Sequence, residues 1–158
     1  MKIVWDLDGV IRDLSGEITK RYMPDFKITT WYWKYKDLDV YDYVNRNKAI
    51  LEECPVTEYY EIAKEIPDLV IWTRQPDSWI YGTVKWVQKY LPRASMRIFG
   101  PQECKEESIL SDCDYIIEDY PMFKNYDKVI LIDRPYNQEV ESKIRIKTPE
   151  MLREVLCK

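Results

Sequence analysis

Two aspartates stand two residues apart in the stretch VWDLDGVIRD, residues 4–13, at the end of an apolar run. Residues i and i+2 of a strand point to the same side, so the carboxylates of Asp6 and Asp8 would lie about 5–7 Å apart. Like charges at that distance repel each other unless a proton or a cation lies between them. The stretch is therefore either an acidic turn or part of a metal site.

Other polar side chains also stand where apolar runs end. Thr73 and Arg74 follow the run DLVIW, and Glu118 and Asp119 follow the run DYII. In a parallel α/β sheet, ligands bind beyond the carboxyl ends of the strands. A random scatter of polar residues would not follow strand ends in this way, so we expect these side chains to meet at one edge of a sheet.

The chain contains no histidine. This excludes Ser-His-Asp and Cys-His hydrolases, metal sites built on histidine and imidazole general bases. Any catalysis must use carboxylates, lysine, arginine, hydroxyls, thiols or a metal held by oxygen. The four cysteines form no CxxC pair, so we expect unpaired thiols in a reducing compartment.

Short aliphatic runs alternate with helical patterns along the chain. We predict strands over residues 2–7, 68–73, 96–99, 115–117, 129–132 and 144–146. We predict helices over residues 58–66 and 78–91, and a final helix that begins at Thr148-Pro149-Glu150. This alternation predicts an α/β fold with a doubly wound, Rossmann-like parallel sheet.

The segment after the first strand breaks the alternation. It holds no credible core strand, and we predict for it a loop-rich start followed by a helix over residues 38–51. Asp13 either pins this loop or caps the next helix. We interpret residues 14–66 as a small, mainly helical cap inserted over the active edge, with residues 1–13 and 67–158 as the α/β core.

The predicted cap is rich in aromatic residues. Eight of the 22 residues at 22–43 are Phe, Trp or Tyr, against a chain average of 14%. Two interpretations are open. Large side chains build the core of a small subdomain, or one or two rings stack on a ligand base, each contributing about 1–3 kcal/mol. Trp31 and Trp33 are our candidates for substrate contact.

Charge and hydropathy limit the partners. The net charge of −4 argues against a nonspecific nucleic-acid binder, which normally has a basic face, but not against a small phosphorylated ligand. The charge leads us to expect no nucleic-acid polymer as partner. No apolar run approaches about 18 residues, so we expect no membrane as partner either. The start, MKIVWDLD, lacks the apolar core of a signal peptide, and we expect a cytoplasmic protein. The oligomeric state stays open.

The ordered motifs resemble those of the haloacid dehalogenase-like phosphohydrolases. DLDGV after the first strand, VIWT at the end of the next, a downstream lysine and the acid pair of DYIIED carry the resemblance, which covers roughly residues 1–137. Within that superfamily, DLDGVIRD, YGTVKWVQKYLP and VILIDRPYN are similar to the 5'(3')-deoxyribonucleotidase group.

The resemblance implies roles for the acids. Asp6 would attack phosphorus and form an aspartyl-phosphate, while Asp8 would protonate the leaving alkoxide and later deprotonate water. The implied ligands are all oxygens, which suit the hard cation Mg²⁺. They are Asp6, the backbone carbonyl of Asp8, Glu118 and Asp119.

The resemblance also assigns groups to the phosphate. Thr73 would donate a hydrogen bond to it, and Lys105 would neutralise charge on the nucleophile and the phosphate. Lys85 is the alternative lysine, but it lies on a helix whose buried face is aromatic. A carboxylate about 4 Å from a phosphate meets a repulsion of about 4 kcal/mol per pair of unit charges at a dielectric near 20, so the acids need the cation and the lysine.

Two further residues complete the expected substrate site. Gly9 would permit the backbone turn after the first strand. Arg74 stands where the nucleotidase group usually has a small serine, and it could instead clamp the phosphate through two hydrogen bonds. The acid pair is Glu-Asp rather than Asp-Asp, a change that the wider superfamily accommodates.

We therefore expect a Mg²⁺-dependent phosphomonoester hydrolase that acts on nucleoside monophosphates, deoxyribonucleotides in particular. Two alternatives stay open: a phosphatase for another small metabolite, such as a sugar phosphate, and a non-catalytic domain that binds a nucleotide or a protein partner. Rates of hydrolysis on a panel of phosphomonoesters distinguish the first alternative from a nucleotidase. The intact set of acids speaks against the second.

Overall fold

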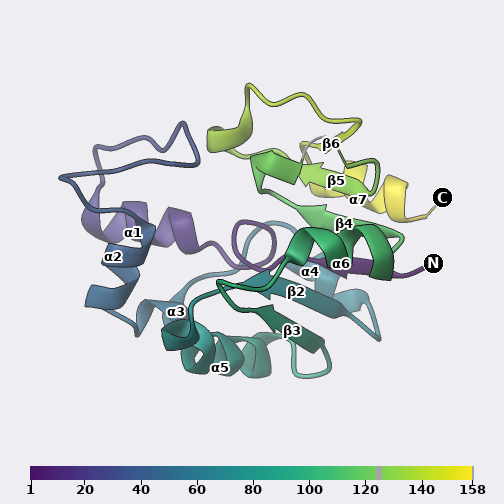
Figure 1. Cartoon of the computed structure of the whole chain (residues 1–158), viewed down its shortest axis with the longest axis horizontal. Coiled ribbons are helices and arrows are strands. Elements are labelled where there is room, and N and C mark those ends of the chain that lie inside the picture. Colours follow the sequence, from purple (N-terminus) through teal and green to yellow (C-terminus); the bar gives the residue numbers. More distant parts are fainter. Residues whose placement is uncertain (124–125, 158) are drawn as a thin grey trace.

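The computed structural model describes residues 1–123 and 126–157. Its centre is a six-stranded parallel sheet in the order β3-β2-β1-β4-β5-β6 (Figure 1). The strands are β1 (Ile3–Trp5), β2 (Val70–Arg74), β3 (Ser95–Phe99), β4 (Tyr115–Glu118), β5 (Val129–Ile132) and β6 (Ile144–Ile146). The predicted parallel α/β sheet is confirmed, and each strand overlaps a run identified in the sequence.

Helices connect the strands and flank the sheet. The α-helices are α1 (Leu14–Tyr22), α2 (Val40–Arg46), α3 (Ile50–Glu53), α4 (Tyr60–Glu65), α5 (Ile80–Tyr90), α6 (Lys105–Asp112) and α7 (Pro149–Leu156). The 3₁₀ turns are η1 (Asp77–Trp79), η2 (Pro121–Phe123) and η3 (Pro135–Asn137). The predicted helix over 78–91 thus begins as η1 and continues as α5. The predicted cap of the final helix is present, since Thr148 accepts a hydrogen bond from the backbone N–H of Met151 at 3.4 Å.

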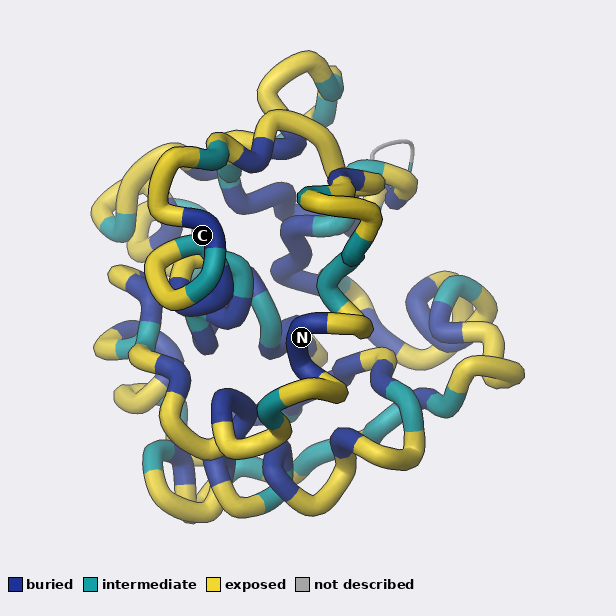
Figure 2. Tube along the Cα trace, turned by 90° about the vertical axis from the view of Figure 1, so that its left-hand side faces the viewer, coloured by how far each residue is buried: buried dark blue, intermediate teal, exposed yellow. Residues whose placement is uncertain are grey.

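The sheet is covered on both faces. Successive strand residues point to opposite sides, so neighbours in one strand belong to different cores. Trp5 and Ile117 pack in the larger core, together with residues of α4, α5 and α7. Val4 and Ile116 pack in the smaller core, together with Ile109 of α6. In Figure 1, α6 lies in front of the sheet and α4 behind it, and Figure 2 shows buried segments running through the middle of the molecule.

The order of the strands determines where a ligand can bind. β1 lies between β2 and β4, and the chain moves outward from β1 to β2 and β3 before it crosses to β4 on the other side. This reversal leaves a crevice beyond the carboxyl ends of β1 and β4, where ligands of open α/β sheets bind. α1 and α2 lie beyond the same ends of the strands (Figure 1).

The segment between β1 and β2 differs from the prediction in two ways. The first part of the expected loop-rich start is instead α1, capped by Asp13, which accepts a hydrogen bond from the backbone N–H of Gly16 at 3.0 Å, whereas residues 23–39 form a loop as expected. The single helix expected over 38–51 is wrong, because the chain leaves the helical conformation at Asn47 and forms α2 and α3. Asn47 donates a side-chain hydrogen bond to the Tyr22 hydroxyl at 2.9 Å, which ties this break to α1.

This segment shares the larger core with the sheet. Leu51 of α3 packs so closely on α5 that a Cβ at Gly82 would lie 2.8 Å from the Leu51 Cβ. Trp86 of α5 donates a hydrogen bond to the carbonyl of Cys54 at 2.7 Å. The position of the segment over the strand ends is therefore held by buried packing against α5.

Among the described residues, no helix combines the length and the apolar character that crossing a membrane requires. All four cysteines are free thiols, as expected; Cys54 and Cys113 are buried, whereas Cys104 and Cys157 are exposed.

Candidate active site

Three carboxylates meet at the carboxyl ends of β1 and β4. Trp5 pairs with Ile117 across the two strands, and the backbone N–H of Asp6 donates to the Ile117 carbonyl at 2.8 Å. This register sets Asp6 beside Glu118 and Asp119, which directly follow Ile117. One oxygen of each carboxylate lies within 4.8 Å of the others, and all three residues are buried.

Lys105 lies between two of these acids. It is the first residue of α6, and its Nζ donates to Oδ1 of Asp6 at 2.5 Å and to Oε2 of Glu118 at 2.7 Å. Burial alone would lower the pKa of Lys105, but the two carboxylates outweigh it and raise the pKa. The alternative, Lys85, is exposed on α5, with its ammonium 5.6 Å from the centre of the Tyr81 ring.

Among the described residues, these three acids outnumber the one cationic side chain that bonds to them. Three carboxylates against the Lys105 ammonium leave two formal negative charges. Burial, and next the neighbouring Glu118, raise the pKa of Asp6 to about 8 although Lys105 opposes the rise. Burial, Glu118 and Asp6 likewise raise the pKa of Asp119 well above its usual value. The buried Oδ1 of Asp119 also has no hydrogen-bond partner among the described residues. An all-oxygen site with this excess charge and an unpartnered carboxylate oxygen fits a divalent cation such as Mg²⁺.

Further contacts orient Asp119. The hydroxyl of Tyr136 donates a short hydrogen bond to its Oδ2, and the Asn137 side chain donates to its backbone carbonyl at 2.9 Å. Both residues belong to η3, which follows β5 at the same edge of the sheet. The motif VILIDRPYN predicts no role for these two residues, although PYN follows a strand end as the acids do.

Gly9 meets two structural requirements. Its φ of +79° is in the left-handed region, which favours glycine. In addition, a Cβ at this position would lie 2.0 Å from Oδ2 of Asp119 and 2.5 Å from the Tyr136 hydroxyl. Sequence reasoning anticipated the turn but not the close approach of the loop to Asp119.

Asp8 lies apart from the three clustered acids. Its carboxylate forms a two-point ion pair with Arg12, at 2.6 and 2.9 Å, and accepts a hydrogen bond from Gln75 at 2.7 Å. Its side chain is 24% exposed and lines the cavity described below. Sequence reasoning identified Asp8 but neither of its partners.

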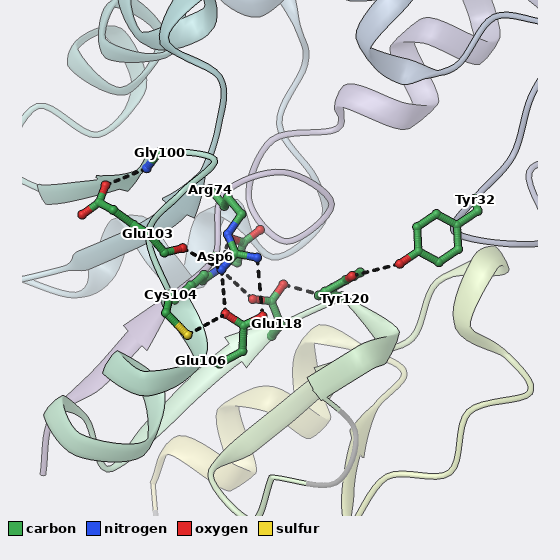
Figure 3. Close-up of polar contacts among 10 residues, drawn as sticks. Asp6, Tyr32, Arg74, Gly100, Glu103, Cys104, Glu106, Glu118 and Tyr120 are labelled. Atoms are coloured by element: carbon green, nitrogen blue, oxygen red, sulfur yellow. Dashed lines mark hydrogen bonds and ion pairs between the residues drawn. The ribbon is translucent and has the colours of Figure 1, made fainter.

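Thr73 and Arg74 occupy the end of β2 beside the acids. Thr73 is buried and lines the cavity. Arg74 also lines it, but its guanidinium pairs with Glu106 of α6 at 2.6 Å and donates to the Glu103 carbonyl at 3.1 Å (Figure 3). The arginine expected to clamp a phosphate is therefore held by α6 in this conformation.

A cavity of about 360 Å³ opens onto the acids. Asp6, Asp8, Thr73, Lys105 and the acid pair form its polar part. The remaining wall is mainly aromatic and includes Trp31, Tyr32, Trp33, Tyr41, Trp79, Tyr120, Phe123 and Tyr136. The cavity thus joins a cluster of acids to a surface suited to a flat, apolar group.

The two candidate tryptophans differ in their surroundings. Trp31 is 37% exposed, and its ring centre lies 4.7 Å from that of Tyr120 and 5.3 Å from that of Tyr136. Trp33 is 8% exposed and packs against Phe26 and Tyr43, with ring centres 6.1 Å apart in both pairs. Both line the cavity, but Trp33 mainly fills the interior of the segment, whereas Trp31 lies against residues that adjoin the acids.

Comparisons with known proteins add no assignment. No protein-family model matches the chain, and no curated protein matches it significantly. The interpretation of the cavity therefore depends on its own geometry, namely clustered acids, one buried lysine and an aromatic wall at the carboxyl edge of a parallel sheet.

Proposed function

We propose that this protein is a Mg²⁺-dependent phosphomonoester hydrolase, and that nucleoside monophosphates are its substrates. The observation that carries the proposal is the cluster of Asp6, Glu118 and Asp119 within 4.8 Å, with Lys105 bonded to the first two. At the strand ends, a phosphate that enters the cavity would meet the buried Lys105 and a cation site. Both are needed to bring a carboxylate to a phosphate dianion.

Asp6, Glu118 and Asp119 would hold the cation, together with the backbone carbonyl of Asp8. Mg²⁺ bound there would neutralise charge on the phosphate and on the acids. Lys105 contributes the positive charge that the chain itself supplies. Its bonds to Asp6 and Glu118 hold both carboxylates in place before a substrate binds.

Asp6 is the proposed nucleophile. A carboxylate oxygen of Asp6 forms a bond to phosphorus while the bond from phosphorus to the leaving oxygen breaks. Asp8, which lines the same cavity, would begin this step protonated, give its proton to that leaving oxygen and become a carboxylate. Asp8 then takes a proton from water, the water oxygen attacks phosphorus, and phosphate leaves as the Asp6 carboxylate is restored. Thr73, which is buried and lines the cavity, would donate a hydrogen bond to a phosphate oxygen.

The aromatic wall favours a substrate with a flat ring. A nucleobase stacked on one aromatic side chain gains about 1–3 kcal/mol, and a cavity of about 360 Å³ is of the size usual for small ligands. The preference for a deoxyribose derives from the sequence resemblance alone. In this proposal residues 14–66 act as a cap that covers the acids and supplies the rings.

Phosphate release from a panel of substrates tests the proposal. Ribo- and deoxyribonucleoside monophosphates and sugar phosphates are compared with Mg²⁺ and with a chelator. We expect hydrolysis that needs Mg²⁺ and is fastest for nucleotides. Sugar phosphates that react far faster than any nucleotide would refute the substrate class, and release that is indifferent to Mg²⁺ would refute the chemistry.

A further inference from the structure

Arg12 lies wholly inside the protein, where an arginine is rarely found without partners. Its Nε and Nη2 donate to Oδ1 and Oδ2 of Asp8 at 2.6 and 2.9 Å. Nη1 donates to the Leu51 carbonyl at 3.0 Å, and Nη2 also donates to Oγ1 of Thr83 at 3.2 Å. The guanidinium carbon lies 5.7 Å from the centre of the Trp86 ring. Contacts from α3 and α5 thus fix the orientation of this side chain.

Gln75 closes these contacts into a ring. The Thr83 hydroxyl donates to Oε1 of Gln75 at 2.5 Å, and Nε2 of Gln75 donates to Oδ2 of Asp8 at 2.7 Å. Arg12, Gln75 and Thr83 are all buried, and of the four members only Asp8 lines the cavity. The ring is therefore a buried support behind a single accessible carboxylate.

Packing alone does not account for such a ring. Removing a charge from water costs several kcal/mol, and apolar side chains of similar volume often serve stability as well as a buried ion pair does. A two-point contact between guanidinium and carboxylate also allows essentially one orientation of the carboxylate. Orientation of Asp8 is thus what the ring provides beyond stability.

The hydrogen bonds also distinguish the two oxygens of Asp8. Oδ2 accepts from both Arg12 and Gln75, which occupies its two acceptor positions. Among the described residues, Oδ1 accepts only from Nε of Arg12 and keeps one acceptor position. Oδ1 is therefore the oxygen that can exchange a proton with a group in the cavity.

We infer that Arg12 is a positioning residue that holds Asp8 so that its Oδ1 faces the leaving oxygen of the substrate, with Gln75 as a second support. This inference rests on the proposed function, in which Asp8 is the general acid. A shift of about 1 Å in a reacting group can cost about 100-fold in rate, so the precision of the support has a measurable effect.

Two substrates with different leaving groups test the role of Arg12. A deoxyribonucleoside 5′-monophosphate releases an alkoxide that needs a proton, whereas 2,4-dinitrophenyl phosphate releases a phenolate that needs none. Arg12→Lys keeps the charge but loses the two-point contact. We expect it to lower kcat/KM for the nucleotide by about 10- to 100-fold with an almost unchanged KM, and to lower kcat/KM for the aryl ester by less than about threefold.

Two further variants complete the experiment. Arg153→Met removes another two-point pair, with Glu65 at 2.5 and 3.0 Å, but an exposed one, and it should leave both substrates unaffected. Gln75→Leu removes one support of Asp8 while Arg12 stays. It should lower kcat/KM for the nucleotide by about 3- to 10-fold and leave kcat/KM for the aryl ester almost unchanged. This variant keeps the test valid if Arg12→Lys does not fold.

The outcomes separate the inference from the proposed function. An equal loss on both substrates in a folded Arg12→Lys or Gln75→Leu variant would mean a purely structural ring and would overturn the inference alone. Absence of Mg²⁺-dependent phosphate release from the unchanged protein, on either substrate, would overturn the proposed function and the inference together.

Discussion

The two walls of the cavity are built in different ways. The acidic wall comes from the ends of β1 and β4 and the first residue of α6, where strand register sets each side chain. Much of the aromatic wall comes from the loop between α1 and α2, residues 23–39, which carries Trp31, Tyr32 and Trp33. Its rings are held by contacts with one another and with Tyr120 and Tyr136.

Under the proposed function, this difference separates the residues that carry out the reaction from those that select the substrate. Moving an acid requires a change in the register of a buried parallel sheet, so the acidic wall admits little variation. A loop tolerates substitution far more readily, so the aromatic wall can change to suit another ligand without disturbing the acids. We expect changes in the acidic wall to affect the rate of reaction and changes in the aromatic wall to affect KM.

The largest effect is expected at the proposed nucleophile. Asp6→Asn removes the attacking oxygen and should lower Mg²⁺-dependent kcat by about 10⁴-fold or more, while urea unfolding stays cooperative. Asp39→Asn is the matched control, because Asp39 lines the cavity without belonging to the acid cluster and caps α2, a role that Asn also fills. Its kcat should stay within about threefold. Unchanged turnover in Asp6→Asn would eliminate the aspartyl-phosphate scheme.

Gly9→Ala should damage the acidic wall with no loss of a functional group. Its Cβ would collide with Asp119 and its φ would be strained, so we expect a loss of about 1–3 kcal/mol in unfolding free energy and weaker Mg²⁺ binding by calorimetry. Gly100→Ala is the control, because the nearest atom to its added Cβ is the end of the Glu103 side chain at 3.5 Å. Equal Mg²⁺ affinity in the two variants would show that the turn at Gly9 accommodates the added Cβ without moving Asp119.

Much of the acidic wall could be predicted from the sequence, because its signals are local. Uninterrupted aliphatic runs indicated the strands, and polar residues at their ends indicated which side chains would meet. The ring behind Asp8 could not be predicted, since Gln75 is 67 positions away and Thr83 lies on a helix that only tertiary packing brings near. The break at Asn47 escaped prediction for a similar reason, because its partner Tyr22 is 25 positions away.

Two substitutions in the aromatic wall distinguish a ring that contacts the ligand from a ring that packs in the core. Trp31→Ala should raise KM for a nucleotide by about 5- to 100-fold, the equivalent of about 1–3 kcal/mol of stacking, with little loss of stability because the ring is partly exposed. Trp33→Ala should instead lower the unfolding free energy by about 3–5 kcal/mol, since its ring is buried against Phe26 and Tyr43. Steady-state kinetics and urea unfolding on both variants separate the roles. An unchanged KM in Trp31→Ala would assign that ring to packing alone.

The last prediction concerns pH and belongs to the acidic wall alone. The pKa of Asp6 is raised from 3.8 to about 8 in the folded protein, and that of Asp119 is raised as well, so between pH 4 and 8 the folded state holds more protons than the unfolded chain. Stability without a cation should therefore fall as pH rises from 5 to 8, by at most about 1.4 kcal/mol per pH unit for each group.

Mg²⁺ should remove this decline, because the cation binds the ionised acids and favours the folded state more strongly at pH 8 than at pH 5. Urea unfolding at both pH values, with Mg²⁺ and with a chelator, measures the difference. Asp6→Asn lacks one of the titrating groups and should show a shallower decline without the cation. If Mg²⁺ stabilised the protein equally at both pH values, the clustered acids would not be its binding site. The acidic wall could then no longer be assigned to the chemistry of the reaction.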